Sequence, residues 1–551
     1  MSYSQLKARA KKRLSQGLGT QYPRVLVQVA NCSQAVGAGE ALESLRREVT
    51  QRGLKVSVVE AGCDGACYQA PVVLLQHPDG RAFRFTQVVP SGVPELVQGW
   101  LEGKPDDLRP WNGESPLWTM DGDKSGFWSL QKRLVLEDCG QISSQDIDEY
   151  IARGGYASLG QVLSSLSPEQ VIETVEKSGL AGRGGAYFPV ARKWQGARAQ
   201  TKTPRYLVIN AEEGEPGIFK DRHIMEGISH RLIEGMVIAA YAIGAERGFL
   251  YINGEAHLSA QRMIHALRQA EENQLLGDNI LDSGFSFHVE VRRGAGGYVL
   301  GEETALLNSI EGERDVPRTR PPFPVEAGLW QQPTVINNVE TLSNLPYILS
   351  PNGADFASLG IERSKGTKVI SLSGRVERPG LVEVPMGTTI RRIVFDIGGG
   401  PLPGHDIKGV VAGGPSGGLL PYSQLDIPIQ SGMLDEQGAV LGSGGITVLD
   451  ETISTVEAVR RLAAYNAAES CSKCTPCREG TDRILHILDK MMEGKGQPQD
   501  LDDLTYLAEI VGFGSLCGLG QMAGGPIRSG MHHFGDEFAA SVGVPKNDRR
   551  A

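Results

Sequence analysis

The sequence has little cysteine, few aromatic residues and no long apolar run. It contains 8 cysteines among 551 residues, and 6% of its residues are aromatic. Such sparse cysteine excludes a disulfide-stabilised scaffold. The most apolar stretch, residues 235–244, is too short to cross a bilayer, so we expect no membrane insertion. Residues 1–16 are basic and lack the apolar core of a secretory signal, so we expect a reducing, cytoplasmic location in which cysteines bind metals or fill cores.

Basic residues are outnumbered by acidic ones. The chain has 55 Lys and Arg residues against 65 Asp and Glu residues, a net charge of −10. Because the nucleic-acid backbone requires a basic surface, this balance argues against a nucleic-acid-binding protein. An apolar content of 40% excludes intrinsic disorder. The length predicts roughly three to five domains, and the 70 glycines direct attention to glycine-rich loops.

The pattern of apolar residues predicts an α/β multidomain chain. The first region, residues 1–105, alternates short strands with helices such as 39–52, which is typical of a small thioredoxin-like domain. Residues 106–141 are rich in Pro, Gly, Asp and Trp and form a predicted linker. We expect this linker to pack on a neighbouring domain through Trp111 and Trp118.

Three further regions follow the linker. Strands and helices alternate over residues 142–350, which predicts a doubly wound, Rossmann-like domain. Within it, Ser167 begins a capping box and Gly179 ends the same helix. Residues 366–445 combine short strands, Gly/Pro turns and one helix, which suggests a β-grasp domain. Residues 450–545 have helical periodicity and predict a helical bundle.

The most specific motif is a cysteine cluster near the C-terminus. Cys471, Cys474 and Cys477 are spaced three residues apart, and Cys517 follows after 39 further residues. Three thiolates on one short loop can turn inward around a compact cluster, and a fourth from another connection completes the ligand set of [4Fe–4S]. Structural zinc is the main alternative, although it usually takes two separated C-x-x-C pairs. Plain structural thiols are the third interpretation.

A glycine-rich loop occupies residues 179–189, with the sequence GLAGRGGAYFP. Gly182, Gly184 and Gly185 would let the backbone approach an anion closely. Arg183 in this loop and Lys193 beyond it add positive charge. An ordinary glycine turn without a ligand explains the pattern equally well.

Polar side chains follow the predicted strand at residues 205–210. Asn210, Glu212, Glu213 and Glu215 come directly after it, and carboxylates in this place suit the hydroxyls of a sugar or ribityl chain. A solvated acidic loop is the alternative. Two other segments are similarly ambiguous: a flexible loop leads to Glu302 and Glu303, and Asn337 and Asn338 could hold a ligand or cap a helix.

Taken together, these motifs resemble one family. GRGGAYFP, NAEEGEPGIFKDR, GAGGYVLGEETALL, PTVINNVETLSNLP, ESCSKCTPCREGT and SLCGLGQMA occur in the order seen in the NADH-binding flavoprotein subunit of respiratory complex I. The diaphorase subunits of soluble NAD-reducing hydrogenases and NAD-dependent formate dehydrogenases share this order. The resemblance extends over about residues 134–537.

The resemblance implies a set of site residues. The positions that match the family's FMN pocket are Gly182, Arg183, Gly184, Gly185, Lys193, Asn210, Glu212, Glu213, Tyr298, Gly301, Glu302, Asn337, Asn338 and Thr341. Those that match its NAD(H) site are Phe188, Glu215, Glu303, Arg320 and Phe323. Cys471, Cys474, Cys477 and Cys517 match its [4Fe–4S] ligands.

The implied function is that of an NADH:acceptor oxidoreductase subunit. Hydride carries two electrons whereas an iron–sulfur cluster accepts one, so a flavin must stand between them, and the protein itself supplies no catalytic acid, base or nucleophile. The expected partners are iron–sulfur subunits of a hydrogenase, a formate dehydrogenase or a complex I-like assembly. A scaffold without NADH turnover and an electron-bifurcating subunit remain alternatives. The Glu303 carboxylate is expected to repel a 2′-phosphate and so to favour NAD over NADP.

Several positions depart from the family pattern. Tyr187 stands where glycine is usual, Arg320 replaces a lysine, and Gly196 stands where an aromatic residue is common. Tyr187 and Gly196 support the scaffold alternative, because flavin access and adenine stacking could differ there.

The first region resembles the thioredoxin-like [2Fe–2S] domain of related subunits. Cys63 and Cys67 have the required spacing and Cys32 follows the first predicted strand, but Gly37 stands where a fourth cysteine is expected. Three thiols are compatible both with a [2Fe–2S] cluster held by Cys32, Cys63 and Cys67 and with a cluster-free docking domain. Cys139 is expected to be a core or loop thiol.

Overall fold

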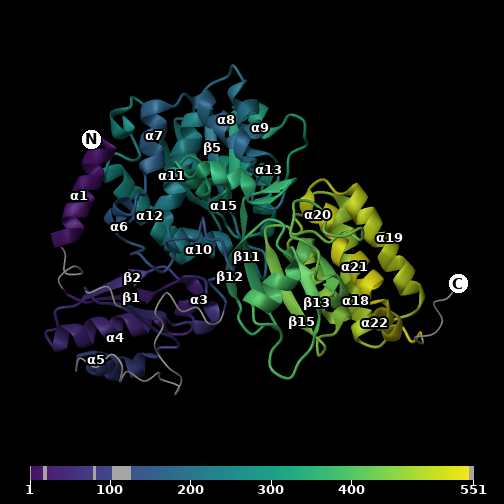
Figure 1. The fold of residues 1–551 in the computed structure, drawn as a ribbon. Coiled ribbons are helices and arrows are strands. Elements are labelled where there is room, and N and C mark those ends of the chain that lie inside the picture. The colour runs from purple at the N-terminus through teal and green to yellow at the C-terminus, as the bar shows by residue number, and fades with distance from the viewer. Residues whose placement is uncertain (1, 17–21, 79–81, 102–125, 545–551) are drawn as a thin grey trace.

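The computed structural model describes residues 2–16, 22–78, 82–101 and 126–544. Most of the predicted linker, including Trp111 and Trp118, lies outside the described residues. Figure 1 shows a purple N-terminal sheet at the lower left, a teal region above it, a green sheet at the lower centre and yellow helices at the right. The chain is thus a mixed α/β multidomain protein with a helical C-terminal region.

The N-terminal sheet has four strands in the order β2-β1-β3-β4. They are β1 (Arg24–Gln28), β2 (Ser57–Ala61), β3 (Val73–Gln76) and β4 (Ala82–Phe85), with α3 (Asn31–Gln34), α4 (Ala38–Gln51) and α5 (Val93–Leu101) between and after them. Strands β1 and β2 are parallel, and the other pairs are antiparallel. Apolar residues of α4 and α5 share one core with alternate residues of the strands, because side chains on a strand alternate between its faces.

Helix α1 (Tyr3–Gln16) corrects the expected boundary of the first region. Leu6 and Ala10, one turn apart, are fully buried in the core of the second region rather than in that of the N-terminal sheet. Arg13 forms ion pairs with Asp146 and Asp148 beside α6 (Ile147–Ala152). Residues 1–105 therefore do not pack as one module, and Figure 1 shows α1 beside α6 and α12.

The second region contains a four-stranded parallel sheet in the order β7-β6-β5-β8. Its strands are β5 (Tyr206–Ala211), β6 (Arg247–Ile252), β7 (His288–Arg293) and β8 (Thr334–Asn338). Its helices after α6 are α7 (Ala157–Ser165), α8 (Pro168–Ser178), α9 (Val190–Arg198), α10 (Lys220–Gly227), α11 (Ser229–Ile243), α12 (His257–Glu272), α13 (Glu303–Glu311), α14 (Pro324–Ala327), α15 (Val339–Ser343) and α16 (Leu345–Ile348). Successive residues of β5 contribute to two different cores, so the sheet is buried on both faces.

Local signals in this region are confirmed. The Ser167 hydroxyl accepts from the Gln170 amide at the start of α8, and Gly179 ends the helix in a left-handed conformation. Helix α11 is almost wholly buried, and its Gly235 is required by close packing: a Cβ there would lie 2.1 Å from the Leu342 carbonyl oxygen.

The third region contains a five-stranded mixed sheet in the order β12-β11-β15-β13-β14. Its strands are β11 (Thr367–Gly374), β12 (Gly380–Pro385), β13 (Ile407–Ala412), β14 (Gly418–Pro421) and β15 (Gly445–Asp450), preceded by the short pair β9 (Gly360–Ile361) and β10 (Ser364–Lys365). The helix expected at residues 389–395 is instead largely a π-helix over Arg392–Ile397, packed on this sheet.

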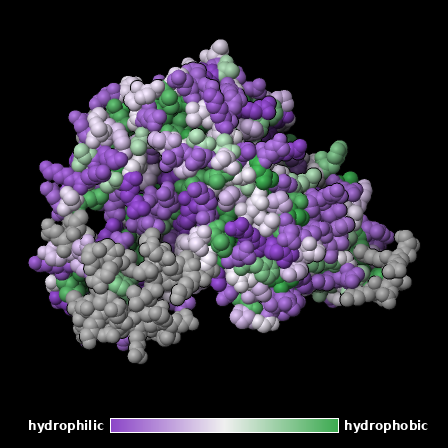
Figure 2. All heavy atoms as spheres, viewed as in Figure 1, coloured by the Kyte–Doolittle hydropathy of each residue, from purple (hydrophilic) through white to green (hydrophobic). Residues whose placement is uncertain are grey.

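The C-terminal region is helical. It comprises α17 (Thr455–Ala468), α18 (Thr475–Met492), α19 (Gln499–Gly514), α20 (Gly518–Met522), α21 (Gly525–His533) and α22 (Gly535–Ser541). Its core includes Val411 and Leu419 from the neighbouring sheet, so the two regions pack together. In the part of the chain that the structure describes, we find no helix with the length and apolarity needed to span a bilayer. On the face shown in Figure 2, hydrophilic residues predominate and hydrophobic ones are scattered.

Candidate functional site

The main cavity consists of two adjoining pockets of about 600 and 430 Å³. Both are lined by Gly184, Asn210, Gly301, Glu302 and Asn338. The larger also contains Gly182, Phe188, Lys193, Glu303, Arg320, Phe323, Asn337 and Thr341, and the smaller contains Gly185, Glu212, Glu213, Glu215 and Tyr298. The fold thus brings together all the flavin and nicotinamide positions implied by the sequence, with one exception.

The exception is Arg183. Its side chain lines neither pocket; instead the buried guanidinium donates to the carbonyl oxygens of Ala181, Lys365 and Thr367. Only its backbone belongs to the site, where the amide donates to Thr341 Oγ1 at 2.8 Å. The expected contribution of Arg183 to ligand charge stays a prediction; in this structure the residue holds the glycine loop against the third region.

Two asparagines mark where parallel strands end together. Asn210 of β5 pairs in register with Asn338 of β8, at the edge of a parallel sheet where ligands commonly bind. The Asn210 amide donates to the Gly301 carbonyl oxygen at 2.9 Å. Asn338 caps α15 by accepting from the Glu340 amide at 3.0 Å, so the helix-cap interpretation and the pocket position hold at once.

The carboxylates after β5 line the smaller pocket, where Glu213 is buried and Glu212 is half-buried. Burial raises the pKa of Glu212 to about 7, and burial together with Asp221 raises the pKa of Glu213 to about 7. Glu212 Oε1 accepts from Asn253 at 2.7 Å, whereas its buried Oε2 has no hydrogen-bond partner among the described residues. An orphaned acceptor of this kind suits a ligand hydroxyl, which donates a hydrogen bond. The solvated-loop alternative does not fit these buried groups.

Behind the pocket lies a buried charge network that sequence reasoning missed. Lys220 Nζ is 2.7 Å from Asp221 Oδ1 and 3.2 Å from Glu340 Oε2, and Lys368 pairs with the same Glu340. Burial opposes the charge on Glu340, but the two lysines overcome it and lower its pKa. Asp221 also accepts from Asn338 Nδ2 at 2.6 Å, so the network holds a pocket residue in place. Lys220 and Asp221 lie in the NAEEGEPGIFKDR motif, but no sequence signal marks Lys368.

The wall of the larger pocket combines one carboxylate with two cations. Lys193 Nζ lies 3.2 Å from Glu303 Oε2, and Arg320 Nη1 lies 3.0 Å from Glu303 Oε1. Phe188 and Phe323 each remain 50% exposed at the same pocket. Half-exposed aromatic faces beside paired charges can stack on flat rings and bind phosphate or hydroxyl groups.

The four C-terminal cysteines converge beside this cavity. Cys477 and Cys517 are buried, Cys474 begins α18 and Cys517 begins α20. Burial raises the pKa of Cys517 to about 11, and the nearby charges of Glu302 and Cys471 add to the shift. Backbone amides of Leu519 and Gly520 donate to Cys517, and a helix N-terminus favours negative charge.

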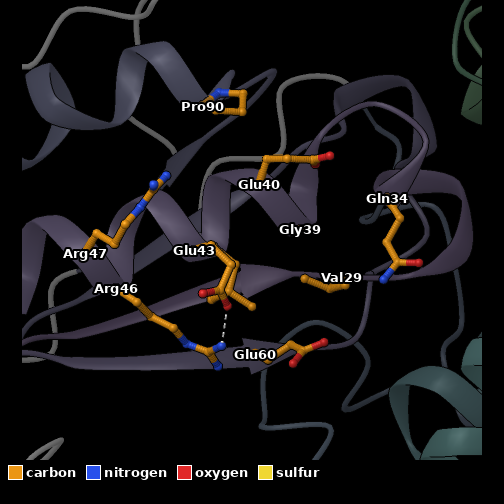
Figure 3. A pocket seen from close by; sticks show the side chains of 10 residues that line it. Val29, Gln34, Gly39, Glu40, Glu43, Arg46, Arg47, Glu60 and Pro90 are labelled. Carbon is orange, nitrogen blue, oxygen red and sulfur yellow. Dashed lines mark hydrogen bonds and ion pairs between the residues drawn. The ribbon is translucent and has the colours of Figure 1, made fainter.

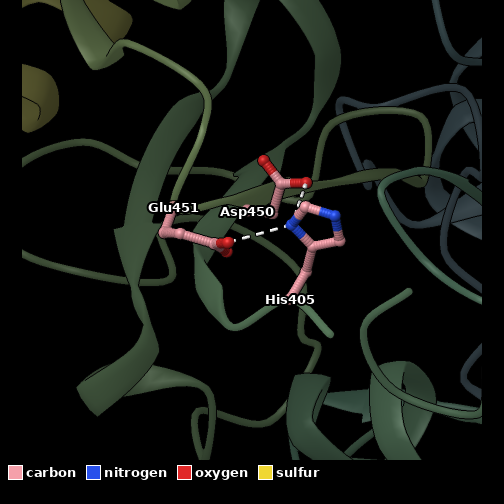
Figure 4. A group of neighbouring side chains, drawn as sticks. All are labelled: His405, Asp450 and Glu451. Atoms are coloured by element: carbon pink, nitrogen blue, oxygen red, sulfur yellow. Dashed lines mark hydrogen bonds and ion pairs between the residues drawn. The ribbon is translucent and has the colours of Figure 1, made fainter. Parts of the chain in front are cut away.

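One other group of metal-ligand side chains lies outside this cavity. Among the described residues, the only metal-ligand group whose atoms all lie within 4.8 Å of one another is His405, Asp450 and Glu451. That group is an ion-pair network on the third sheet, because His405 Nδ1 is 2.9 Å from Glu451 (Figure 4) and Arg375 Nε is 3.5 Å from Asp450.

A third pocket, of about 670 Å³, lies on the N-terminal sheet. Its lining residues come mainly from α4, with Gln34 from α3, Glu60 from β2 and Pro90 from the turn before α5, and Arg46 pairs with Glu43 at 2.7 Å (Figure 3). No residue that the sequence implicated in cofactor binding lines it.

Comparison with known proteins agrees with this arrangement. Residues 175–347 match the family described as the Nuo51 FMN-binding domain, and residues 457–541 match the NADH-ubiquinone oxidoreductase-F iron-sulfur binding region. The NADP-reducing hydrogenase subunit HndC of Solidesulfovibrio fructosivorans is 46% identical over 75% of this chain and 84% of its own. The second of the NADH-quinone oxidoreductase F subunits of Rhizobium meliloti is 45% identical over 72% of this chain and 94% of its own.

The chain belongs to the family of NADH-binding flavoprotein subunits of complex I. As a member of this family it is an NADH oxidoreductase flavoprotein subunit with an FMN-binding domain and a [4Fe–4S]-binding region. The fold agrees over nearly the whole chain: a crystal structure of NAD+-reducing [NiFe]-hydrogenase has a TM-score of 0.67 at 28% identity, covering 99% of this chain and 90% of the other.

The departures from the pattern of this flavoprotein family have visible structural consequences. Tyr187, in place of the usual glycine, has a φ of 52°, the left-handed conformation that glycine adopts without strain. Its ring packs against the core of the third region and lines the larger pocket, while its hydroxyl has no partner among the described residues. Gly196 lines neither pocket, so the structure links it to no change in stacking.

The three N-terminal thiols are brought together by β1, β2 and the turn after β2. Hydrogen bonds from the Cys63 and Cys67 thiols lower the pKa of Cys32 to about 3, and the same coupling raises the pKa of Cys63. Cys32 is exposed and Cys63 is buried. Cys139 is a buried core thiol of the second region, as expected.

Proposed function

We propose that the main cavity binds FMN and NAD(H), and that electrons leave it one at a time through a [4Fe–4S] cluster held by Cys471, Cys474, Cys477 and Cys517. One observation carries this proposal: Cys517 lines the same pocket as Glu213 and Tyr298. A cluster ligand that forms part of the wall of the flavin pocket offers a short path from one cofactor to the other. Bound FMN would supply the step between two-electron and one-electron chemistry.

The chain's own residues would bind and orient the ligands. Gly185, with a φ of 114°, lets the backbone run close to a bound phosphate, and Lys193 lies at the same cavity. The orphaned Glu212 Oε2 would accept from a ribityl hydroxyl. Phe188 and Phe323 would stack on the nicotinamide dinucleotide, and Glu303 would accept from a ribose hydroxyl.

Glu215 and Tyr298 give the floor of the smaller pocket its shape. The Tyr298 hydroxyl donates to Glu215 Oε1 at 2.7 Å, and Ser443 donates to Glu215 Oε2. This half-buried set is hydrogen-bonded internally, so it would hold the nicotinamide and flavin rings at a fixed distance. No residue is assigned an acid, base or nucleophile role.

We further propose an iron–sulfur subunit as the electron acceptor. Tyr506, Ile510 and Phe513 form an exposed apolar row on α19, and Phe513 is 96% exposed four residues before Cys517. A protein surface beside a redox centre with such side chains fits a subunit interface. The partner would belong to a hydrogenase, a formate dehydrogenase or a complex I-like assembly.

The domain assignment is also a proposal. The N-terminal mixed sheet with two helices on one face supports a thioredoxin-like domain, and the parallel β7-β6-β5-β8 sheet supports a Rossmann-like domain. The five-stranded mixed sheet with one packed helix supports a β-grasp domain. We retain the predicted ranges 142–350, 366–445 and 450–545, and assign α1 to the second domain. A cytoplasmic location is proposed because all eight cysteines are free thiols.

The test is NADH-dependent ferricyanide reduction by the purified, flavin-loaded chain. We expect turnover with one FMN per chain and a broad absorption from Cys-ligated iron–sulfur. A flavin-loaded chain that does not oxidise NADH would support the scaffold alternative, and a colourless preparation containing zinc would contradict the cluster. The path by which electrons leave is tested with an added ferredoxin-type protein. We expect the wild type to reduce this protein stoichiometrically. The Phe513→Glu variant, which alters the exposed surface of α19, should lose this reduction.

A further inference from the structure

One buried histidine has an unused ring nitrogen beside the N-terminal thiols. His223, on α10 of the second region, is 4% exposed, and its Nε2 has no hydrogen-bond partner among the described residues. A buried polar atom without a partner is costly and calls for an explanation such as a missing ligand. No sequence motif had marked this residue.

Helix α10 is fixed against the thiol-bearing loops at two points. The amide of Asn31, next to Cys32, donates to Glu226 at 2.9 Å. Gly62, next to Cys63, lies so close to Gly227 that a Cβ there would come within 2.2 Å of the Gly227 Cα. His223 is one helical turn before Gly227, so it is held beside both cysteines.

The ring itself contacts the loop that carries Cys63. The Cys63 backbone hydrogen-bonds the His223 ring, and Cys32 is close enough to interact with it electrostatically. The Gly65 amide donates to Cys63 Sγ at 3.4 Å. Cys67 in turn hydrogen-bonds Cys32 and Cys63. In Figure 1, α10 lies above α3.

We propose that His223 is the fourth ligand of a [2Fe–2S] cluster held by Cys32, Cys63 and Cys67. Histidine replaces cysteine on iron in some two-iron centres, where it raises the reduction potential. The residue thus compensates for Gly37 at the place of the usual fourth cysteine. The ligand is supplied by the second region, so the cluster would fasten the N-terminal sheet to the flavin domain.

The donor set fits a two-iron cluster. Thiolates and imidazoles are the ligands that two-iron centres use. All four residues belong to the described part of the chain.

The position of α10 links this centre to the flavin pocket. Lys220 and Asp221, at the first turn of α10, bond to Asn338 of the pocket, and His223 lies two residues further along. At a rise of about 1.5 Å per residue, Asp221 and His223 are about 3 Å apart along the helix axis, so one short helix contacts both sites. The proposal rests on these contacts and not on the proposed function of the flavin site.

The experiment measures iron, acid-labile sulfide and flavin in the full-length chain, purified anaerobically. The wild type should contain about six irons, four from one cluster and two from the other. His223→Ala should lose about two irons and the two-iron EPR signal, and His223→Cys should retain both. Exposed His288→Ala is the matched control and should match the wild type.

A spectroscopic measurement on the wild type removes any dependence on variant folding. With ¹⁵N-histidine labelling, the reduced two-iron signal should show nitrogen hyperfine coupling that is absent from His223→Cys. A wild type with only about four irons, one zinc in place of two irons, or a His223→Ala variant that keeps its two-iron signal would each overturn the proposal. Flavin and the four-iron cluster are measured in the same variants. If both stay unchanged while the His223 proposal fails, the proposed flavin site is unaffected by that result.

Discussion

Lys193 Nζ lies 3.2 Å from Glu303 Oε2, and Arg320 holds the other oxygen of the same carboxylate at 3.0 Å. Considered from the sequence alone, Glu303 is an isolated negative charge that repels a 2′-phosphate. The structure instead places it between two cations, so its carboxylate keeps both from binding phosphate. Coenzyme preference therefore depends on the three residues together.

Glu303→Gln should shift this preference. Removing the charge frees Lys193 and Arg320 for a 2′-phosphate, so kcat/KM for NADPH should rise roughly tenfold, a change of about 1.4 kcal/mol, while that for NADH falls. Steady-state kinetics with both coenzymes measure the effect. The exposed Glu290→Gln serves as control, and an unchanged NADPH:NADH ratio in Glu303→Gln would contradict the assignment.

Cys517→Ala should remove the four-iron cluster. Because this thiol is one of four ligands at the pocket wall, its loss should lower iron by about four per chain, while FMN stays bound and ferricyanide is still reduced. Transfer to an iron–sulfur partner should cease. Cys139→Ala changes a buried thiol that no motif assigns to a cluster, and it should keep its full iron content.

Glu212 should make the flavin-free chain less stable as pH rises. Its pKa of about 7, raised by burial, exceeds the unfolded value near 4.3, so the native state binds the extra proton between these pH values. The stabilisation is complete below about pH 4.3 and is lost as pH rises through 7. Thermal unfolding from pH 5 to 8 should show a fall in Tm that is smaller in Glu212→Gln. Parallel curves for the two proteins would argue against a protonated Glu212.

Tyr187 should respond differently to glycine and to alanine. Both substitutions remove the ring from the core of the third region, but only glycine relieves the left-handed backbone with its φ of 52°. Tyr187→Gly should therefore unfold at a higher temperature than Tyr187→Ala, by an amount equivalent to about 1 kcal/mol. Calorimetry of the two variants decides this, and equal Tm values would remove backbone strain as an explanation.

Local features could be predicted from the sequence because the residues that form them are only a few positions apart. The Ser167 capping box, the Gly179 helix end and most of the strands need only neighbouring side chains and apolar alternation. The cluster motif is also local for three of its four thiols. Linear spacing is sufficient for such features, so the sequence alone determined the family, the cofactor chemistry and most of the pocket residues.

Tertiary structure decided which long-range partners these residues meet. The Arg183 side chain lies outside the two pockets because its guanidinium donates to three carbonyl oxygens, two of them from the third region. Helix α1 joins the second region because its Leu6 and Ala10 find an apolar surface there. His223 lies beside the N-terminal thiols because Gly62 packs on Gly227 and Asn31 donates to Glu226. Such contacts join positions far apart in the chain, and spacing in one sequence carries no information about them.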